Sequence, residues 1–214
     1  MWAKICGVTD PALARKIAQA GPSAIGLNFY RPSPRCVAVD VAAQIARALP
    51  AHVEPIGVFV NHSVDDVLDI ARTVGLRTVQ LHGDEEPAQA AEVADAGLQI
   101  IRAFRVDDSG LGDLEQELEQ YRDLRVELRG CLVDAKVAGS YGGTGHAAPW
   151  KLLAAQWRCD WPPLILAGGL RPENVRAAID AVRPWGVDTA SGVEASPGRQ
   201  DLEKVRQFLE AAQR

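Results

Sequence analysis

WAKICGV, residues 2–8, is a short apolar run whose last three residues are Cys6, Gly7 and Val8. The helix-start signal Thr9-Asp10-Pro11 follows it directly. An apolar, β-rich run of this length predicts a buried strand, and a capping residue before proline predicts the first turn of a helix. The stretch therefore predicts a strand followed by a helix, with Cys6 at the end of the strand.

The same strand–helix unit recurs along the whole chain. Apolar runs predict strands over residues 3–6, 24–29, 55–60, 78–81, 99–104, 131–134, 164–167 and 186–189. Amphipathic segments predict helices over residues 11–20, 39–49, 64–74, 87–96, 111–121, 150–157, 172–182 and 201–212. Eight units of about 27 residues each predict a closed (β/α)₈ barrel, with residues 1–214 as a single domain.

An open, doubly wound sheet is the alternative architecture. Such a sheet usually has fewer strands and carries a GxGxxG turn after the first one, whereas residues 6–10 read CGVTD. Because no linker or low-complexity segment divides the sequence, we favour the closed barrel.

Composition narrows the class of function. The chain has 214 residues, 47% of them hydrophobic, and a formal net charge of −5, so it has no basic footprint for nucleic acid. Its apolar runs are all much shorter than the roughly 20 residues of a membrane span, and its start lacks the pattern of a signal peptide. We expect a cytoplasmic protein that acts on a small molecule.

The cysteines do not predict a metal or redox centre. Cys6, Cys36, Cys131 and Cys159 lie far apart, and none of them forms a CxxC pair. They are therefore predicted to be free thiols, and we expect neither a metal nor a cofactor.

Barrel geometry indicates where a site would lie. Active sites of this fold occupy the carboxyl ends of the strands, so the residues that close each apolar run are the candidates. They include Cys6 after the first strand, Arg35 after the second, His82 after the fourth and Asp134 at the end of the sixth.

The loops after the last two strands are typical of phosphate binding. LILAGGLRPENV, residues 164–175, and VDTASGVEASPG, residues 187–198, each place small residues between a strand and a helix. Backbone amides can approach an anion closely at such positions. A tight turn is the alternative for either loop alone, but two adjacent units favour phosphate. The candidate phosphate residues are Gly168, Gly169, Ser191 and Gly192.

A set of motifs in order carries a family resemblance. They are KICG at residues 4–7, SPR at 33–35, GVFVN at 57–61, QLHGDE at 80–85, YGGTG at 141–145, LAGGLRPENV at 166–175 and SGVEASPG at 191–198. Together they resemble the phosphoribosylanthranilate isomerases of tryptophan biosynthesis. The resemblance implies a TIM barrel that performs an Amadori rearrangement on a phosphosugar, without cofactor or metal.

The resemblance also implies roles for individual residues. Cys6 would be the general base and Asp134 the general acid. Arg35 would bind the anthranilate carboxylate and Asp188 a ribose hydroxyl, while the phosphate would lie at the glycine loops. His82 is a further candidate for substrate contact.

The chain departs from the family pattern in two places. Residues 189–191 read Thr-Ala-Ser where many members have two adjacent serines, so Ser191 would serve alone. Residues 148–150 read Ala-Pro-Trp where members often have an aspartate, so we expect a change in helix capping rather than in chemistry.

The proposed acid and base start from unfavourable pKa values. A free cysteine has a pKa of about 8.5, so only a few per cent is thiolate near pH 7. A free aspartate, with a pKa of about 3.9, is ionised there and cannot donate a proton. We therefore expect burial and neighbouring negative charge, from Asp188 and the substrate phosphate, to raise the pKa of Asp134.

Each candidate also has a plain structural interpretation. Cys6 could be a small buried hydrophobic residue, and Arg35 a solvated loop residue. Asp134 could cap the next segment or pair with Lys136. His82 could bond to the backbone at a strand end.

Two other functions are compatible with a phosphate-binding barrel. The sister isomerase of histidine biosynthesis follows a similar pattern but with aspartate at the end of the first strand, so Cys6 disfavours that function. A non-catalytic phosphosugar sensor would not need both Cys6 and Asp134. The sequence leaves open whether the protein is a monomer or a homodimer.

Overall fold

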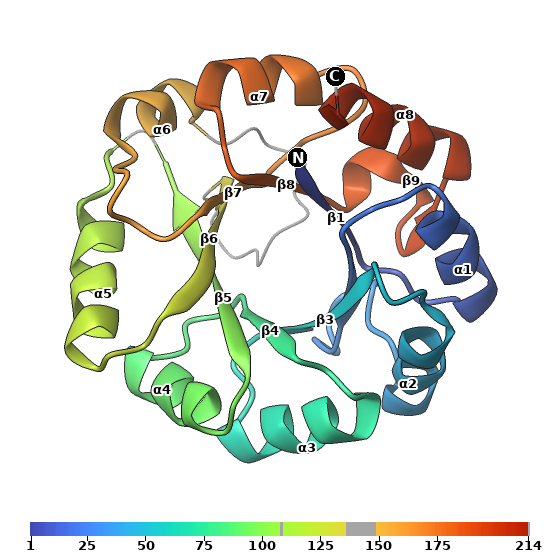
Figure 1. Ribbon diagram of the computed structural model, residues 1–214, viewed down its shortest axis with the longest axis horizontal. Helices are drawn as coiled ribbons and strands as arrows, with labels where there is room; N and C mark the ends of the chain where they lie inside the picture. Colours follow the sequence, from blue (N-terminus) through green and yellow to red (C-terminus); the bar gives the residue numbers. More distant parts are fainter. Residues whose placement is uncertain (108, 136–148, 214) are drawn as a thin grey trace.

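A closed barrel of eight parallel strands, in sequence order, forms the centre of the described chain (Figure 1). The computed structural model describes residues 1–107, 109–135 and 149–213, with only the backbone of residue 135. The barrel strands are β1 (Trp2–Cys6), β2 (Ala24–Asn28), β3 (Glu54–Phe59), β4 (Thr78–Leu81), β5 (Gln99–Val106), β6 (Leu128–Ala135), β7 (Leu164–Leu166) and β8 (Gly186–Thr189). The predicted barrel is thus confirmed.

Helices surround the barrel on all sides (Figure 1). They are α1 (Pro11–Gln19), α2 (Val39–Ala48), α3 (Val64–Val74), α4 (Pro87–Asp95), α5 (Gly112–Asp123), α6 (Trp150–Gln156), α7 (Val175–Val182) and α8 (Leu202–Gln213). Asp10 caps α1 as predicted, because its Oδ1 accepts a hydrogen bond from the Leu13 amide at 2.6 Å. No helix in the described parts of the chain has both the length and the apolar character to cross a bilayer.

Side-chain alternation along the strands divides the core in two. Outward-facing residues such as Ile5 and Val187 pack against the helices, and Leu81 belongs to the same large cluster. A smaller cluster fills the barrel itself and consists of Ala24, Ile56, Ile101, Ala103, Leu132, Ile165 and Ala167. The interior is therefore a packed apolar layer rather than a pore.

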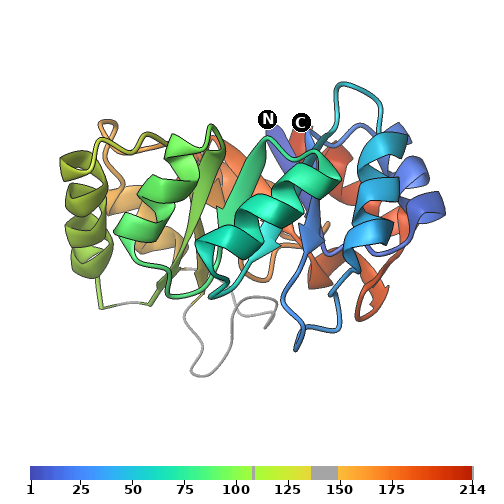
Figure 2. The same ribbon diagram turned by 90° about the horizontal axis from the view of Figure 1, so that it is seen from below.

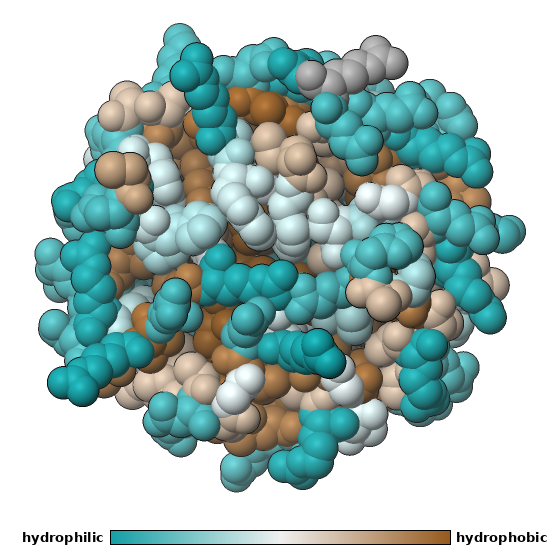
Figure 3. All heavy atoms as spheres, in the orientation of Figure 1, coloured by the Kyte–Doolittle hydropathy of each residue, from teal (hydrophilic) through white to brown (hydrophobic). Residues whose placement is uncertain are grey.

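The two ends of the barrel are distinct. Both chain termini lie at the N-terminal end of the strands, and the loops after β2 and β8 extend from the opposite end (Figure 2). Figure 3 looks onto the N-terminal end, where hydrophilic side chains alternate with apolar ones. The loops that sequence reasoning selected therefore share the other end.

Several element boundaries differ from the predicted ones. α7 begins at Val175 rather than Pro172 because the Asn174 side chain holds a turn: its Oδ1 accepts from the Arg171 amide at 2.8 Å and its Nδ2 donates to the Gly169 carbonyl at 3.0 Å. After the 3₁₀ turn η1 (Ser191–Val193), a small antiparallel pair, β9 (Glu194–Ser196) and β10 (Arg199–Gln200), was not predicted.

The proline at the start of α6 has the expected consequence. Pro149 precedes the helix and makes no side-chain capping hydrogen bond. The predicted glycine-rich segment at residues 141–145 and Lys136 lie outside the described residues.

Candidate active site

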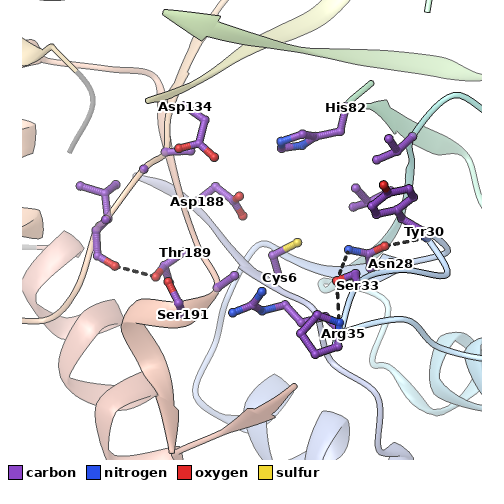
Figure 4. A pocket seen from close by; sticks show the side chains of 18 of the residues that line it. Cys6, Asn28, Tyr30, Ser33, Arg35, His82, Asp134, Asp188, Thr189 and Ser191 are labelled. Carbon is purple, nitrogen blue, oxygen red and sulfur yellow. Dashed lines mark hydrogen bonds between the residues drawn. The ribbon is translucent and has the colours of Figure 1, made fainter. Parts of the chain in front are cut away.

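A cavity of about 310 Å³ opens at the C-terminal end of the barrel. Cys6 at the end of β1, Asp134 on β6 and His82 just after β4 point into it (Figure 4). Arg35, Gly168, Gly169, Asp188 and Ser191 also line it. The structure thus brings nearly all the predicted site residues together.

Glycine after Cys6 has a steric reason. Gly7 has a φ of 76°, a conformation that favours glycine, and a Cβ there would lie 2.6 Å from Cδ of Arg35. The bare Gly7 backbone therefore lets the chain turn out of β1 while the Arg35 side chain lies across it. Cys6 is left at the cavity wall with 8% of its surface exposed.

A buried ion pair lies next to the Cys6 thiol. Lys4, two residues earlier on β1, places its Nζ 2.7 Å from Oδ1 of Asp188 on β8. Burial raises the pKa of the Cys6 thiol; the Lys4 ammonium opposes that effect, and the Asp188 carboxylate adds to it. The net effect is a thiol pKa above its ordinary value.

Arg35 is held by a carboxylate from the segment after β8. Its Nε and Nη2 donate to Oε1 and Oε2 of Glu194, each at 2.7 Å. Glu194 also accepts from the Gly198 amide at 3.0 Å. This two-bond pairing fixes the plane of the guanidinium and joins the loops after β2 and β8.

His82 is a neutral group in the cavity wall. Burial, followed by the positive charges of Lys4, Arg105 and Arg102, lowers the pKa of His82 to about 3. Its Nδ1 lies 2.5 Å from Nε2 of the buried Gln80. If Gln80 donates there, the proton of the neutral ring is on Nε2, which is buried without a hydrogen-bond partner among the described residues.

The glycines of the loops after β7 and β8 have different structural roles. Gly168 and Gly169 have φ values of 84° and 61° and line the cavity with Ser191. Gly192 instead supports the wall, since a Cβ there would lie 1.9 Å from the Leu170 carbonyl oxygen. Of the predicted site residues, Gly192 is the one outside the described cavity lining.

Metal binding finds no support among the described residues. They contain no group of three or more His, Cys, Asp or Glu side chains placed to hold a metal ion. All four cysteines are free thiols, as predicted.

Sequence reasoning missed three residues that support the site. Lys4 could have been found from alternation, because it shares the inward face of β1 with Cys6. Gln80 on β4 likewise lies two residues before His82, which follows the end of that strand. Glu194 lies inside the SGVEASPG motif, but nothing in the sequence connects it with Arg35, which is 159 residues away.

Comparison with known proteins decides the family. The model of the family described as N-(5'-phosphoribosyl)anthranilate (PRA) isomerase matches residues 3–211. This chain belongs to the PRA isomerase family. The curated N-(5'-phosphoribosyl)anthranilate isomerase of Rubrobacter xylanophilus is 43% identical over 98% of this chain and 97% of its own length.

Solved structures of PRA isomerases share the fold over the full chain. The crystal structure of phosphoribosyl anthranilate isomerase from Thermotoga maritima has a TM-score of 0.88 and 37% identity, covering 100% of this chain and 98% of that chain. A second crystal structure contains the enzyme in complex with reduced 1-(o-carboxyphenylamino)-1-deoxyribulose 5-phosphate; its TM-score is 0.85 and its identity 36%, over 100% and 98% of the two chains. Membership of the PRA isomerase family makes this protein an isomerase.

Proposed function

We propose that this protein converts N-(5-phosphoribosyl)anthranilate into 1-(2-carboxyphenylamino)-1-deoxyribulose 5-phosphate in tryptophan biosynthesis, by an Amadori rearrangement with Cys6 as general base and Asp134 as general acid. One observation carries the mechanism: a thiol and a carboxylic acid from β1 and β6 face a single cavity beside two glycine loops. Family membership and the reduced ligand named for a related structure support the choice of substrate.

The first step opens the sugar ring. Asp134 enters this step protonated and delivers its proton to the furanose oxygen, while the bond between that oxygen and C1′ breaks. The electron pair of the anilino nitrogen forms a C=N double bond, so the product is a positively charged iminium. Asp134 lies at the cavity wall with 5% of its surface exposed, so it can meet a bound sugar directly.

The second step removes a proton from carbon. The Cys6 thiolate takes the C2′ proton, and the electrons of that C–H bond form a C1′=C2′ double bond as the iminium becomes a neutral enamine. Transfer of the C2′ hydroxyl proton to solvent, with uptake of a proton at C1′, yields the ketone. The positive iminium favours an adjacent thiolate, which offsets the raised pKa of the Cys6 thiol.

The remaining cavity residues bind and orient the substrate. Arg35, aligned by Glu194, has further N–H donors for the anthranilate carboxylate. Asp188 would accept from a ribose hydroxyl, and the Nε2–H of a neutral His82 would donate to a substrate oxygen. The phosphate would lie between Gly168, Gly169 and Ser191, where backbone amides can meet it.

Purified protein tests this proposal directly. It should convert N-(5-phosphoribosyl)anthranilate to the deoxyribulose product, and its gene should restore growth of a tryptophan auxotroph lacking the isomerase. The matched control is Cys159→Ser, which changes an exposed thiol and should leave turnover unchanged. Absence of both turnover and complementation by soluble, folded protein would contradict the proposal. Whether the enzyme works as a monomer or a homodimer stays a prediction.

A further inference from the structure

The Lys4–Asp188 pair occupies an unusual position in the barrel. Lys4 has no exposed surface, and its ammonium lies 2.7 Å from the Asp188 carboxylate. Desolvating two charges is costly, and replacing such a pair with apolar residues is often neutral or stabilising. Below it, the barrel interior is filled by apolar side chains. Stability alone therefore gives no reason for this pair.

The Lys4–Asp188 pair lies next to the thiol of Cys6. Lys4 and Cys6 are two residues apart on β1 and project to the same face, and Lys4 is paired in register with Asp188 on β8. On the other side, Gly26 of β2 is the register partner of Cys6. A Cβ on Gly26 would lie 2.7 Å from the Cys6 Sγ and 3.2 Å from the Lys4 Nζ. The thiol and the ammonium therefore share the space that a side chain on Gly26 would fill.

Lys4 does not line the cavity, so it can affect the reaction only through the side chains of Cys6 and Asp188. Cys6 and Asp188 line the described cavity, whereas Lys4 lies outside its lining, beneath them. Burial alone would lower the pKa of Lys4, but the Asp188 carboxylate and the Cys6 thiol outweigh it and raise that pKa, so the ammonium keeps its charge. A permanent cation beneath the thiol stabilises negative charge on sulfur.

We propose that Lys4 is a positioning residue for the isomerase reaction: held by Asp188, its ammonium stabilises the thiolate of Cys6 while that thiolate removes the C2′ proton. This inference rests on the proposed role of Cys6 as base. It deepens that role, because Cys6 is buried and would otherwise be disfavoured as a thiolate.

Other titratable groups near the Cys6 thiol also affect its ionisation or face the same cavity. Asp188 from β8 opposes the thiolate, and Arg35 from the loop after β2 favours it. Asp134 on β6 and His82 just after β4 also point into the cavity, and His82 stays neutral because burial lowers its pKa to about 3. Lys4 is the cation with the largest effect on the thiol.

The test follows Cys6 itself rather than turnover alone. The rate of Cys6 alkylation by iodoacetamide is measured against pH, with peptide mass spectrometry to separate Cys6 from the other three cysteines. In Lys4→Met, the midpoint of this titration should move to higher pH, and both alkylation at pH 7 and kcat should fall about tenfold or more. Lys16→Met, an exposed lysine on α1, is the matched control and should change neither.

A second variant keeps the test valid if Lys4→Met fails to fold because it leaves Asp188 unpaired. Lys4→Met/Asp188→Asn removes both charges, and its Cys6 titration should still move to higher pH, by less than in the single variant. An unchanged Cys6 titration in whichever of these variants folds would overturn the proposal. Turnover by Cys6→Ser at the normal rate would instead overturn the proposed base, whatever the lysine does.

Discussion

Both ends of the barrel contain ion pairs, but only at one of them do we find hydrogen-bonding groups that remain available for a ligand. At the N-terminal end, Glu54 accepts from Arg129 at 2.7 Å and from Thr78 at 2.6 Å, so its carboxylate is satisfied within the protein. At the C-terminal end, Nε2 of the buried His82 has no hydrogen-bond partner among the described residues. Arg35 likewise keeps donors beyond the two that bind Glu194.

This difference separates a structural network from a binding site. Buried polar groups are normally satisfied, so a buried ring nitrogen without a partner beside an open cavity indicates a place for a ligand. Changes at the N-terminal end should therefore affect stability, and changes at the C-terminal end should affect turnover or binding.

The largest effect is expected at Asp134. Asp134→Asn keeps the shape and removes the proton needed for ring opening, so kcat should fall by roughly 10²–10⁴-fold. In kcat/KM against pH, the variant should lose the decline at high pH, because that decline requires loss of an acidic proton. Circular dichroism and inorganic phosphate binding serve as controls. Near-normal kcat in a folded variant would remove Asp134 from the mechanism.

A smaller effect, on binding, is expected at Arg35. Arg35→Ala should raise KM for the anthranilate substrate by about tenfold or more while inorganic phosphate affinity stays nearly unchanged. Glu194→Gln keeps the guanidinium but weakens its alignment, so KM should rise less. Equal losses for substrate and phosphate would show that Arg35 does not act on the carboxylate alone.

At the N-terminal end, Glu54 should matter for stability only. Burial would raise the pKa of Glu54, but the hydrogen bonds from Arg129 and Thr78 outweigh it and lower that pKa. A carboxyl group with a lowered folded-state pKa adds stability above its unfolded pKa, and this is lost as pH falls through the folded value. Glu54→Gln should therefore reduce the free energy of unfolding by about 1 kcal/mol at pH 7, and by less at pH 3.

Denaturant titrations at the two pH values, with kcat in parallel, check this prediction. A fall in kcat of tenfold or more in Glu54→Gln, with the fold intact, would mean that the two ends are not independent.

The smallest effect is expected from metal removal. Neither end of the described barrel brings three potential ligands together, and the proposed steps are proton transfers by side chains. Dialysis against EDTA should therefore leave kcat/KM unchanged. Lost activity that returns on adding a divalent cation would contradict this.

Most of the fold and much of the cavity could be predicted, because both follow from local patterns. The period of apolar residues identifies the strands, and the barrel rule then selects the strand ends that carry Cys6, His82 and Asp134. Partners that lie far apart in the sequence could not be predicted in this way. The pairing of Lys4 with Asp188 depends on the register of β1 with β8, and that of Arg35 with Glu194 on the approach of two distant loops.

Local hydrogen bonds and close contacts also determine details that the period of apolar residues does not reveal. The start of α7 was predicted too early because Asn174 forms a turn with the preceding residues. A Cβ on Gly192 would lie 1.9 Å from the Leu170 carbonyl oxygen, a close approach that the sequence does not reveal; contact of Gly192 with phosphate stays a prediction.

Turnover by Cys6→Ser tests the central claim most directly. The substitution nearly preserves size, but an alcohol ionises far less readily than a thiol, so kcat should fall by orders of magnitude while the fold and phosphate binding remain. In kcat/KM against pH, the rise from low pH should disappear. Near-normal kcat in a folded Cys6→Ser variant that still binds phosphate would contradict the account, and Cys6 would then be a packing residue at the end of β1.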